Sequence, residues 1–113
     1  MRFLLLFLIS SCFQQQSITV VEQDRFKAYI AAGHSLIDVR TPEEFAQGHI
    51  EGAQNLNFLA TDFSEKAQKF NKKEPLLLYC RSGNRSAKAA KILDSLGFQQ
   101  LFDLKGGFLA WEK

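Results

Sequence analysis

The sequence predicts a single α/β domain organised around a mostly parallel β-sheet. Short apolar or β-branched runs alternate with longer stretches in which apolar residues recur at helical spacing. The two clearest runs, Leu36–Val39 and Leu76–Tyr79, are largely apolar, as expected of strands covered on both faces. The chain has 113 residues, which is enough for one domain and too few for two.

The composition excludes several classes of protein. Hydrophobic residues make up 46% of the chain, which supports a buried core and excludes a disordered protein. Fourteen Lys and Arg are balanced by twelve Asp and Glu without forming blocks, so no nucleic-acid partner is expected. The cysteines, Cys12 and Cys80, are too few for a disulfide scaffold, and His34 and His49 lie at no metal-ligand spacing from them. We therefore expect neither a metal nor another cofactor.

The first part of the domain is predicted to form a strand, a helix and a second strand. The β-branched run Ile18–Val21 favours a strand. Apolar residues recur at helical spacing over residues 22–32, and Gly33 is typical of the residue that ends a helix. The apolar run Leu36–Val39 then predicts a buried strand.

The middle of the chain begins with a strong helix start, Thr41-Pro42-Glu43-Glu44. A hydroxyl can cap the first N–H groups, proline fits the first turn, and acids favour the positive end of the helix dipole. This helix is expected to end near Gly48. A short strand over residues 52–56 and a helix over residues 62–70 follow.

The last part contains the strongest strand prediction, Leu76–Tyr79, and the longest helix, Ser86–Leu96, with Ser86 as its cap. The residues expected on the buried side of that helix are Ala87, Ala90, Ile92, Leu93 and Leu96. A fifth strand over residues 100–104 and a helical turn over residues 107–111 complete the domain.

Cys80 lies where the strongest strand meets the longest helix, and we expect chemistry there. Ligands bind at the carboxyl ends of parallel strands, and the N–H groups at a helix start favour a thiolate. Arg81 and Arg85 add two permanent positive charges, while Gly83 and Asn84 suit a tight loop whose N–H groups converge on an anion. Each feature alone has a structural explanation. Together they predict an activated sulfur nucleophile beside an anionic substrate.

Three segments resemble the rhodanese family of sulfurtransferases in its single-domain form. They are residues 36–53, which contain Asp38-Val39-Arg40 and Gly48-His49-Ile50; the loop Cys80-Arg81-Ser82-Gly83-Asn84-Arg85-Ser86; and residues 97–111, which contain Gly106-Gly107-Phe108 and Trp111. Together they cover nearly everything after residue 17. The resemblance implies a rhodanese-like fold, with a five-stranded, mostly parallel sheet flanked by helices on both faces.

The resemblance also implies an activity. Cys80 would take a sulfane sulfur from thiosulfate or a related anionic donor, hold it as a persulfide, and pass it to a thiol or to cyanide. The residues expected to contact the donor or its sulfur are Arg81, Ser82, Gly83, Asn84, Arg85 and Ser86. Asp38 and Arg40 match a motif at a neighbouring strand end, where we expect mainly an ion pair and leave contact with the ligand open. His49 is expected to brace loops, and Phe108 and Trp111 to line the core near the pocket.

Two other functions remain open. The same site could carry a persulfide for a partner protein with little turnover of thiosulfate. Small phosphatases and arsenate reductases share this fold, but they place five residues between the nucleophilic Cys and an Arg. Four residues separate Cys80 from Arg85 here, and by that comparison the loop suits a sulfur atom better than a phosphate. The acceptor protein is left unspecified.

The amino terminus has the layout of an export signal. Arg2 precedes seven apolar residues, which would span only about 10 Å as a helix. That is far less than the hydrocarbon core of about 30 Å, so a transmembrane anchor is not expected. Ile9-Ser10-Ser11-Cys12 resembles the bacterial lipoprotein box, which implies cleavage before Cys12 and a lipid on its sulfur. The alternatives are an ordinary cleaved signal and a buried apolar segment with an incidental cysteine.

These patterns divide the chain into three parts: a signal segment over residues 1–11, a tether over residues 12–17, and the domain over residues 18–113. The expected location is the bacterial cell envelope or periplasm, with membrane attachment through lipid on Cys12.

Overall fold

The computed structural model describes residues 16–111 of the chain. Five parallel strands form one sheet in the order β1-β5-β4-β2-β3. The strands are β1 (Ile18–Val21), β2 (Ser35–Asp38), β3 (Gln54–Asn55), β4 (Leu76–Tyr79) and β5 (Leu101–Leu104). All four residues of β4 are buried, because this strand lies in the centre of the sheet with helices on both sides. That position explains its uninterrupted apolar sequence.

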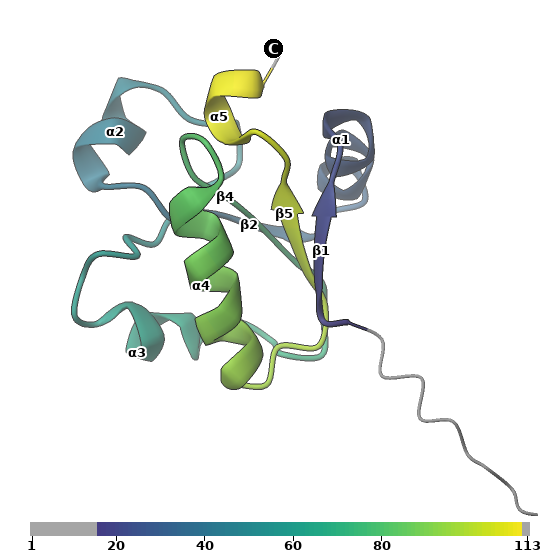
Figure 1. The fold of residues 1–113 in the computed structure, drawn as a ribbon, viewed down its shortest axis with the longest axis vertical. Coiled ribbons are helices and arrows are strands. Elements are labelled where there is room, and N and C mark those ends of the chain that lie inside the picture. Colours follow the sequence, from purple (N-terminus) through teal and green to yellow (C-terminus); the bar gives the residue numbers. More distant parts are fainter. Residues whose placement is uncertain (1–15, 112–113) are drawn as a thin grey trace, which may run out of the picture.

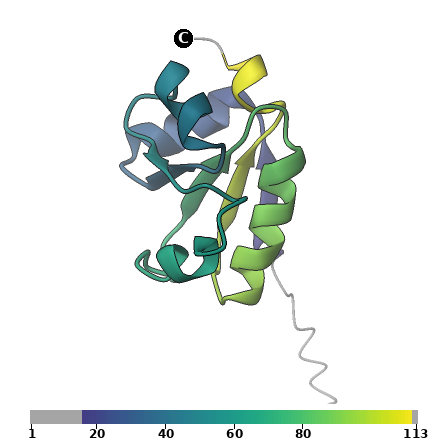
Figure 2. The ribbon, with the colours of Figure 1, turned by 90° about the vertical axis from the view of Figure 1, so that its left-hand side faces the viewer.

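Helices cover both faces of the sheet (Figures 1 and 2). They are α1 (Gln23–Ala31), α2 (Pro42–Gln47), α3 (Phe63–Ala67), α4 (Asn84–Ser95) and α5 (Gly107–Ala110). Phe26 of α1 packs in one core cluster with Leu77 and Tyr79. Residues of α3 and α4, including Phe63 and Leu93, form the other cluster. The predicted α/β fold class, with a five-stranded sheet between helices, is confirmed, and every strand pairing is parallel.

The carboxyl ends of the strands meet α2, α5 and the start of α4, whereas α3 lies toward the opposite end of the sheet (Figure 1). The capping hydroxyl predicted at Thr41 is confirmed, and it belongs to a full capping box: the Glu44 N–H donates to Thr41 Oγ1, and the Thr41 N–H donates to the Glu44 carboxylate. The sequence-predicted helix start thus places α2 beside the end of β4, where Cys80 follows.

The largest differences from the predicted boundaries are in α4, α3 and β3. The helix α4 begins at Asn84 and its N-cap is Gly83, so Ser86 lies inside the first turn and does not cap it. Gly83 has φ of 113°, a conformation that favours glycine, and this lets the chain turn directly from the loop into the helix. On the same helix Ala87 is exposed and Ala89 is buried, contrary to the expected inner face. The helix predicted over residues 62–70 is shorter, and β3 has two residues.

Within residues 16–111, no helix combines the length and the apolar character needed to cross a membrane. The predicted signal segment and Cys12 lie outside the described residues, so their assignment stays a prediction.

Candidate active site

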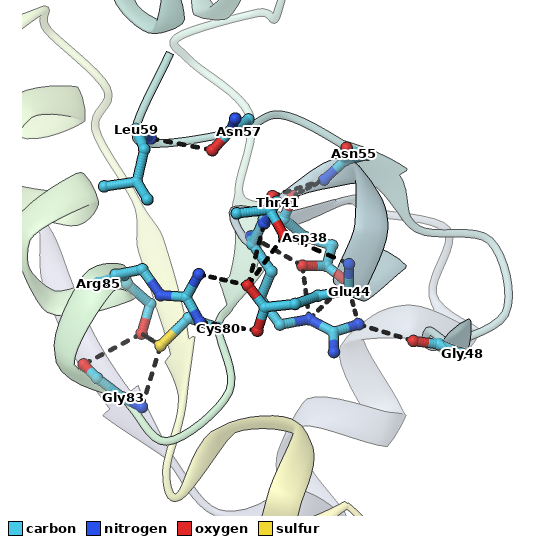
Figure 3. Close-up of polar contacts among 12 residues, drawn as sticks. Asp38, Thr41, Glu44, Gly48, Asn55, Asn57, Leu59, Cys80, Gly83 and Arg85 are labelled. Carbon is cyan, nitrogen blue, oxygen red and sulfur yellow. Dashed lines mark hydrogen bonds and ion pairs between the residues drawn. The ribbon is translucent and has the colours of Figure 1, made fainter. Parts of the chain in front are cut away.

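The Cys80 sulfur lies against the start of α4 (Figure 3). The Gly83 N–H donates to Cys80 Sγ at 3.0 Å, and Sγ lies 3.3 Å from Ser86 Oγ, which itself donates to the Gly83 carbonyl at 3.2 Å. The Gly83 N–H at the helix start donates to the sulfur and stabilises negative charge on it, whereas Ser86 Oγ accepts from the Cys80 thiol. The structure therefore brings Cys80, Gly83 and Ser86 together as predicted. Ser86 contributes its hydroxyl, not only its backbone.

Cys80 is buried, with 1% of its surface exposed. The sequence predicted a reactive nucleophile beside an anionic substrate. A buried sulfur is not directly accessible to a sulfur donor in solution. The residues that directly follow, Arg81 and Ser82, are both exposed. The buried Cys80 is thus followed directly by an exposed loop.

Arg85 does not extend freely toward solvent. Its guanidinium forms a two-pronged ion pair with Glu44, with N–O distances of 2.6 and 2.9 Å. This bond to Arg85 holds the pKa of Glu44 at about 2, and the same bond raises the pKa of Arg85. The Glu44 carboxylate therefore neutralises the Arg85 guanidinium, which the sequence analysis expected to bind the substrate. Arg81 forms no ion pair with any residue in the described range, so its charge is unbalanced.

Asp38 and Arg40 form the ion pair that the sequence predicted. Arg40 Nη2 lies 2.7 Å from Asp38 Oδ2, and its Nε and backbone N–H also donate to the carboxylate. The same Nη2 donates to the Gly48 carbonyl at 2.7 Å, which ties the end of β2 to the end of α2. Both side chains are buried, and Arg40 lies 4.5 Å from the Phe108 ring centre.

His49 also holds a loop in place. Its Nδ1 lies 2.9 Å from the Phe45 carbonyl, and its ring stacks on Phe45 with 3.7 Å between centroids. Both contacts tie His49 to Phe45 of α2, four residues earlier, and its bracing of other loops stays a prediction.

The helix α5 holds the loop that contains Cys80 and Arg81 through backbone hydrogen bonds, and the sequence did not reveal this contact. The Phe108 N–H donates to the Cys80 carbonyl at 2.8 Å, and the Leu109 N–H donates to the Arg81 carbonyl at 3.0 Å. A Cβ on Gly107 would lie 2.5 Å from the Arg81 carbonyl oxygen, so only glycine allows this approach. Phe108 stacks on Tyr79, whereas Trp111 packs against Phe26 of α1.

A pocket of about 220 Å³ opens beside the loop. Its lining residues are Arg40, Glu44, Gln47, Gly48, Arg81, Phe108 and Leu109. Cys80 does not belong to this lining. In this lining Arg40 is paired with Asp38 and Glu44 with Arg85, so Arg81 leaves one unbalanced positive charge that attracts a small anion. Within residues 16–111, no group of three His, Cys, Asp or Glu side chains is placed to hold a metal ion.

Residues 22–113 match the model of the rhodanese-like domain family. Thiosulfate sulfurtransferase 16, chloroplastic, from Arabidopsis thaliana is 39% identical over 94 residues, which cover 74% of this chain and 78% of that protein. Thiosulfate sulfurtransferase GlpE from Stutzerimonas stutzeri is 38% identical over 81 residues, with 71% of this chain and 72% of that protein covered.

The crystal structure of a rhodanese-like domain protein from Staphylococcus aureus superimposes with a TM-score of 0.73 and 29% sequence identity. The match covers 84% of this chain and 92% of that one.

Proposed function

The chain belongs to the rhodanese-like domain family, and we propose that it is a sulfurtransferase whose nucleophile is Cys80. The substrate would be thiosulfate or a related anionic sulfane donor, and the acceptor a thiol or cyanide. The observation that carries the proposal is the position of Cys80 Sγ, 3.0 Å from the Gly83 N–H and 3.3 Å from the Ser86 hydroxyl oxygen at the start of α4. Relatives named thiosulfate sulfurtransferase support the activity at family level.

In the proposed first step, the Cys80 thiolate attacks the outer sulfur of thiosulfate. A new S–S bond forms, the sulfur–sulfur bond of the donor breaks, and sulfite leaves with the electron pair. In the second step, the acceptor attacks the terminal sulfur of the persulfide, and the Cys80 thiolate is restored. No external oxidant or reductant is consumed. The Gly83 N–H and the Ser86 hydroxyl would stabilise the negative sulfur before and after each step.

Arg81 would attract the sulfonate of the donor. It is exposed, lines the pocket beside the loop, and carries the charge that no carboxylate of residues 16–111 balances. Arg85 would contribute less than the sequence suggested, because Glu44 already occupies its guanidinium. Ser82 on the loop and Asn84 at the start of α4 are both exposed and would form the rim of the candidate site. Transfer would require this loop to open above the buried sulfur.

The test is intact mass spectrometry of the full chain after exposure to thiosulfate. We expect a gain of one sulfur, about 32 Da, on the peptide that contains Cys80. The variant Cys80→Ser should lose both this gain and the formation of thiocyanate from thiosulfate and cyanide, while its circular dichroism stays unchanged. Cys12→Ala is the matched control and should retain both. Sulfur loading in Cys80→Ser would contradict the proposal.

The burial of Cys80 also favours a second candidate function, a persulfide carrier that releases sulfur only to a partner protein. A sulfur beneath a closed loop would exchange slowly with small acceptors. Loading of one sulfur per chain with negligible thiocyanate turnover would support the carrier. Steady turnover would support the enzyme.

A further inference from the structure

Leu109 is an exposed apolar residue beside the candidate site that the proposed transfer steps do not use. It is 64% exposed and belongs to neither core cluster, although its neighbours Phe108 and Trp111 pack against one of them. A single exposed leucine is common on a protein surface. The position of this one is what distinguishes it, because Leu109 lines the pocket of about 220 Å³ that opens beside the Cys80 loop.

The backbone holds Leu109 next to the positive charge that the pocket leaves unbalanced. The Leu109 N–H donates to the Arg81 carbonyl at 3.0 Å, and both residues line the same pocket. The other charged residues of that lining, Arg40 and Glu44, already form ion pairs. Arg81 is exposed and forms none with any residue of the described range 16–111. The pocket therefore presents one exposed apolar side chain and one available positive charge.

The size of the pocket and the burial of the sulfur favour a macromolecular acceptor. Pockets that enclose a whole small ligand measure about 300–1,000 Å³, so a pocket of about 220 Å³ suits one or two side chains of a larger molecule. Cys80 is 1% exposed and does not line the pocket. An acceptor held by Leu109 and Arg81 is in contact with the loop that follows the sulfur, where its thiol has to approach.

We propose that Leu109 and Arg81 form a docking surface for the sulfur acceptor, a protein whose reactive cysteine is flanked by an apolar residue and a carboxylate. The apolar residue packs on Leu109 and removes it from water, and the carboxylate pairs with the Arg81 guanidinium. The inference rests on the proposed function, and it names the partner of the second transfer step. Sulfite leaves before the acceptor binds, so Arg81 serves the donor first and the acceptor second.

The step at this surface needs no oxidant or reductant. The acceptor thiol releases its proton to solvent, and its sulfur attacks the outer sulfur of the Cys80 persulfide. A new S–S bond forms on the acceptor, the S–S bond to Cys80 breaks, and Cys80 leaves with the electron pair as a thiolate. The acceptor cysteine becomes the persulfide.

The experiment measures sulfur transfer from the loaded full chain to peptides that carry or lack the two flanking features. The chain is loaded with thiosulfate, freed of excess donor, and checked by intact mass for one added sulfur. The second-order rate of sulfur loss is then measured with acetyl-Leu-Cys-Glu-amide, acetyl-Leu-Cys-Gln-amide, acetyl-Ser-Cys-Glu-amide and 2-mercaptoethanol. Faster transfer to 2-mercaptoethanol than to every peptide would assign the pocket to a small thiol and overturn the proposal.

Leu109→Gln removes the apolar surface and keeps a side chain that favours a helix. We expect it to slow transfer to acetyl-Leu-Cys-Glu-amide about fivefold and to leave the rates with acetyl-Ser-Cys-Glu-amide and 2-mercaptoethanol unchanged. Val20→Thr is the matched control: Val20 is 60% exposed on the edge strand β1, lies outside the pocket, and should affect none of the rates when substituted. Equal rates in Leu109→Gln and the unsubstituted protein would overturn the proposal.

Arg81→Gln tests the charge. The rate ratio of acetyl-Leu-Cys-Glu-amide to acetyl-Leu-Cys-Gln-amide should be about threefold smaller in this variant than in the unsubstituted protein. Comparing this ratio between the two proteins cancels any difference in reactivity between the peptide thiols. An unchanged ratio would contradict the role of Arg81. If thiosulfate does not load Cys80, the proposed function fails and the docking surface fails with it. If loading occurs and Leu109→Gln changes no rate, only this inference fails.

Discussion

The pairing of Arg85 with Glu44 sets how much positive charge the loop can offer to an anion. The two side chains lie 41 positions apart in the sequence and meet through two short N–O contacts, with about a quarter of each side chain exposed. Glu44 also completes the capping box of α2 with Thr41. One carboxylate therefore stabilises a helix start and neutralises a guanidinium of the candidate site.

Glu44→Gln separates these two roles, because glutamine can still complete a capping box but carries no charge. We expect the KM for thiosulfate to fall about two- to fivefold, since the Arg85 charge becomes available to the donor. Glu43→Gln, an exposed acid on the same helix, is the matched control. An equal fall in KM for both variants would show that only net charge matters.

The same variant has a pH signature. Because the pKa of Glu44 is lowered to about 2, its ion pair stabilises the folded state above the usual pKa of glutamate and loses this effect as the pH falls through 2. After allowance for partial exposure, Glu44→Gln should lower the free energy of unfolding by about 1 kcal/mol at pH 7 and by much less near pH 2. Urea denaturation at the two pH values measures the difference.

Among the secondary-structure elements, α5 has the most direct effect on the candidate site. Its first N–H groups hold the carbonyls of Cys80 and Arg81, and Gly107 allows the two backbones to touch. A four-residue helix contributes little stability by itself, so its value lies in fixing the loop that follows β4.

Gly107→Ala should separate α5 from the loop. Its Cβ would lie 2.5 Å from the Arg81 carbonyl oxygen, and its φ of 61° adds strain. We expect a loss of about 3 kcal/mol in the free energy of unfolding together with slower loading of sulfur on Cys80. Gly33→Ala is the control: φ there is 89°, but a Cβ would meet nothing within 4 Å, so only backbone strain of about 1–2 kcal/mol is expected. Equal losses in the two variants would show that the contact with the loop is unimportant.

The elements also show what a sequence can predict. The strand β4 and the start of α2 were predictable because their signals are local: an apolar run, a capping residue and a proline. The sequence analysis placed the start of α4 two residues late. The N-cap is Gly83, which has no hydrogen-bonding side chain that would mark a helix start in the sequence. Ala87 and Ala89 are the same residue type on the same helix. Only the packing of α4 against the sheet decides that Ala89 is buried and Ala87 is exposed.

The same distinction holds in the candidate site. Cys80, Gly83 and Ser86 are close in sequence, so their meeting was predictable. The pairing of Glu44 with Arg85 and the support from α5 depend on how distant elements pack.

At the scale of the molecule, the described chain enters the sheet at the end opposite to the candidate site. The Ser17 carbonyl accepts from the Leu101 N–H at the amino end of β5, whereas Cys80 follows the carboxyl end of the neighbouring strand β4 (Figure 1). We propose, from the sequence around Cys12, that the protein is lipid-anchored in the bacterial envelope. An anchor on this side would leave the site facing away from the membrane.

Cys12→Ala tests the anchor. The unsubstituted protein, expressed in a bacterium, should sediment with membranes, and the variant should appear in the soluble fraction because it lacks the sulfur that carries the lipid. Cys80→Ser is the control and should sediment like the unsubstituted protein. Soluble behaviour of the unsubstituted protein would contradict the prediction.

The contact between α5 and the Cys80 loop also has a consequence for biosynthesis. A chain leaves the ribosome with its amino end first, so all five strands and Cys80 emerge before residues 107–110 do. Until then the carbonyls of Cys80 and Arg81 lack the N–H groups that hold them. A sheet that forms before α5 has packed would therefore lack the two hydrogen bonds that hold the Cys80 loop.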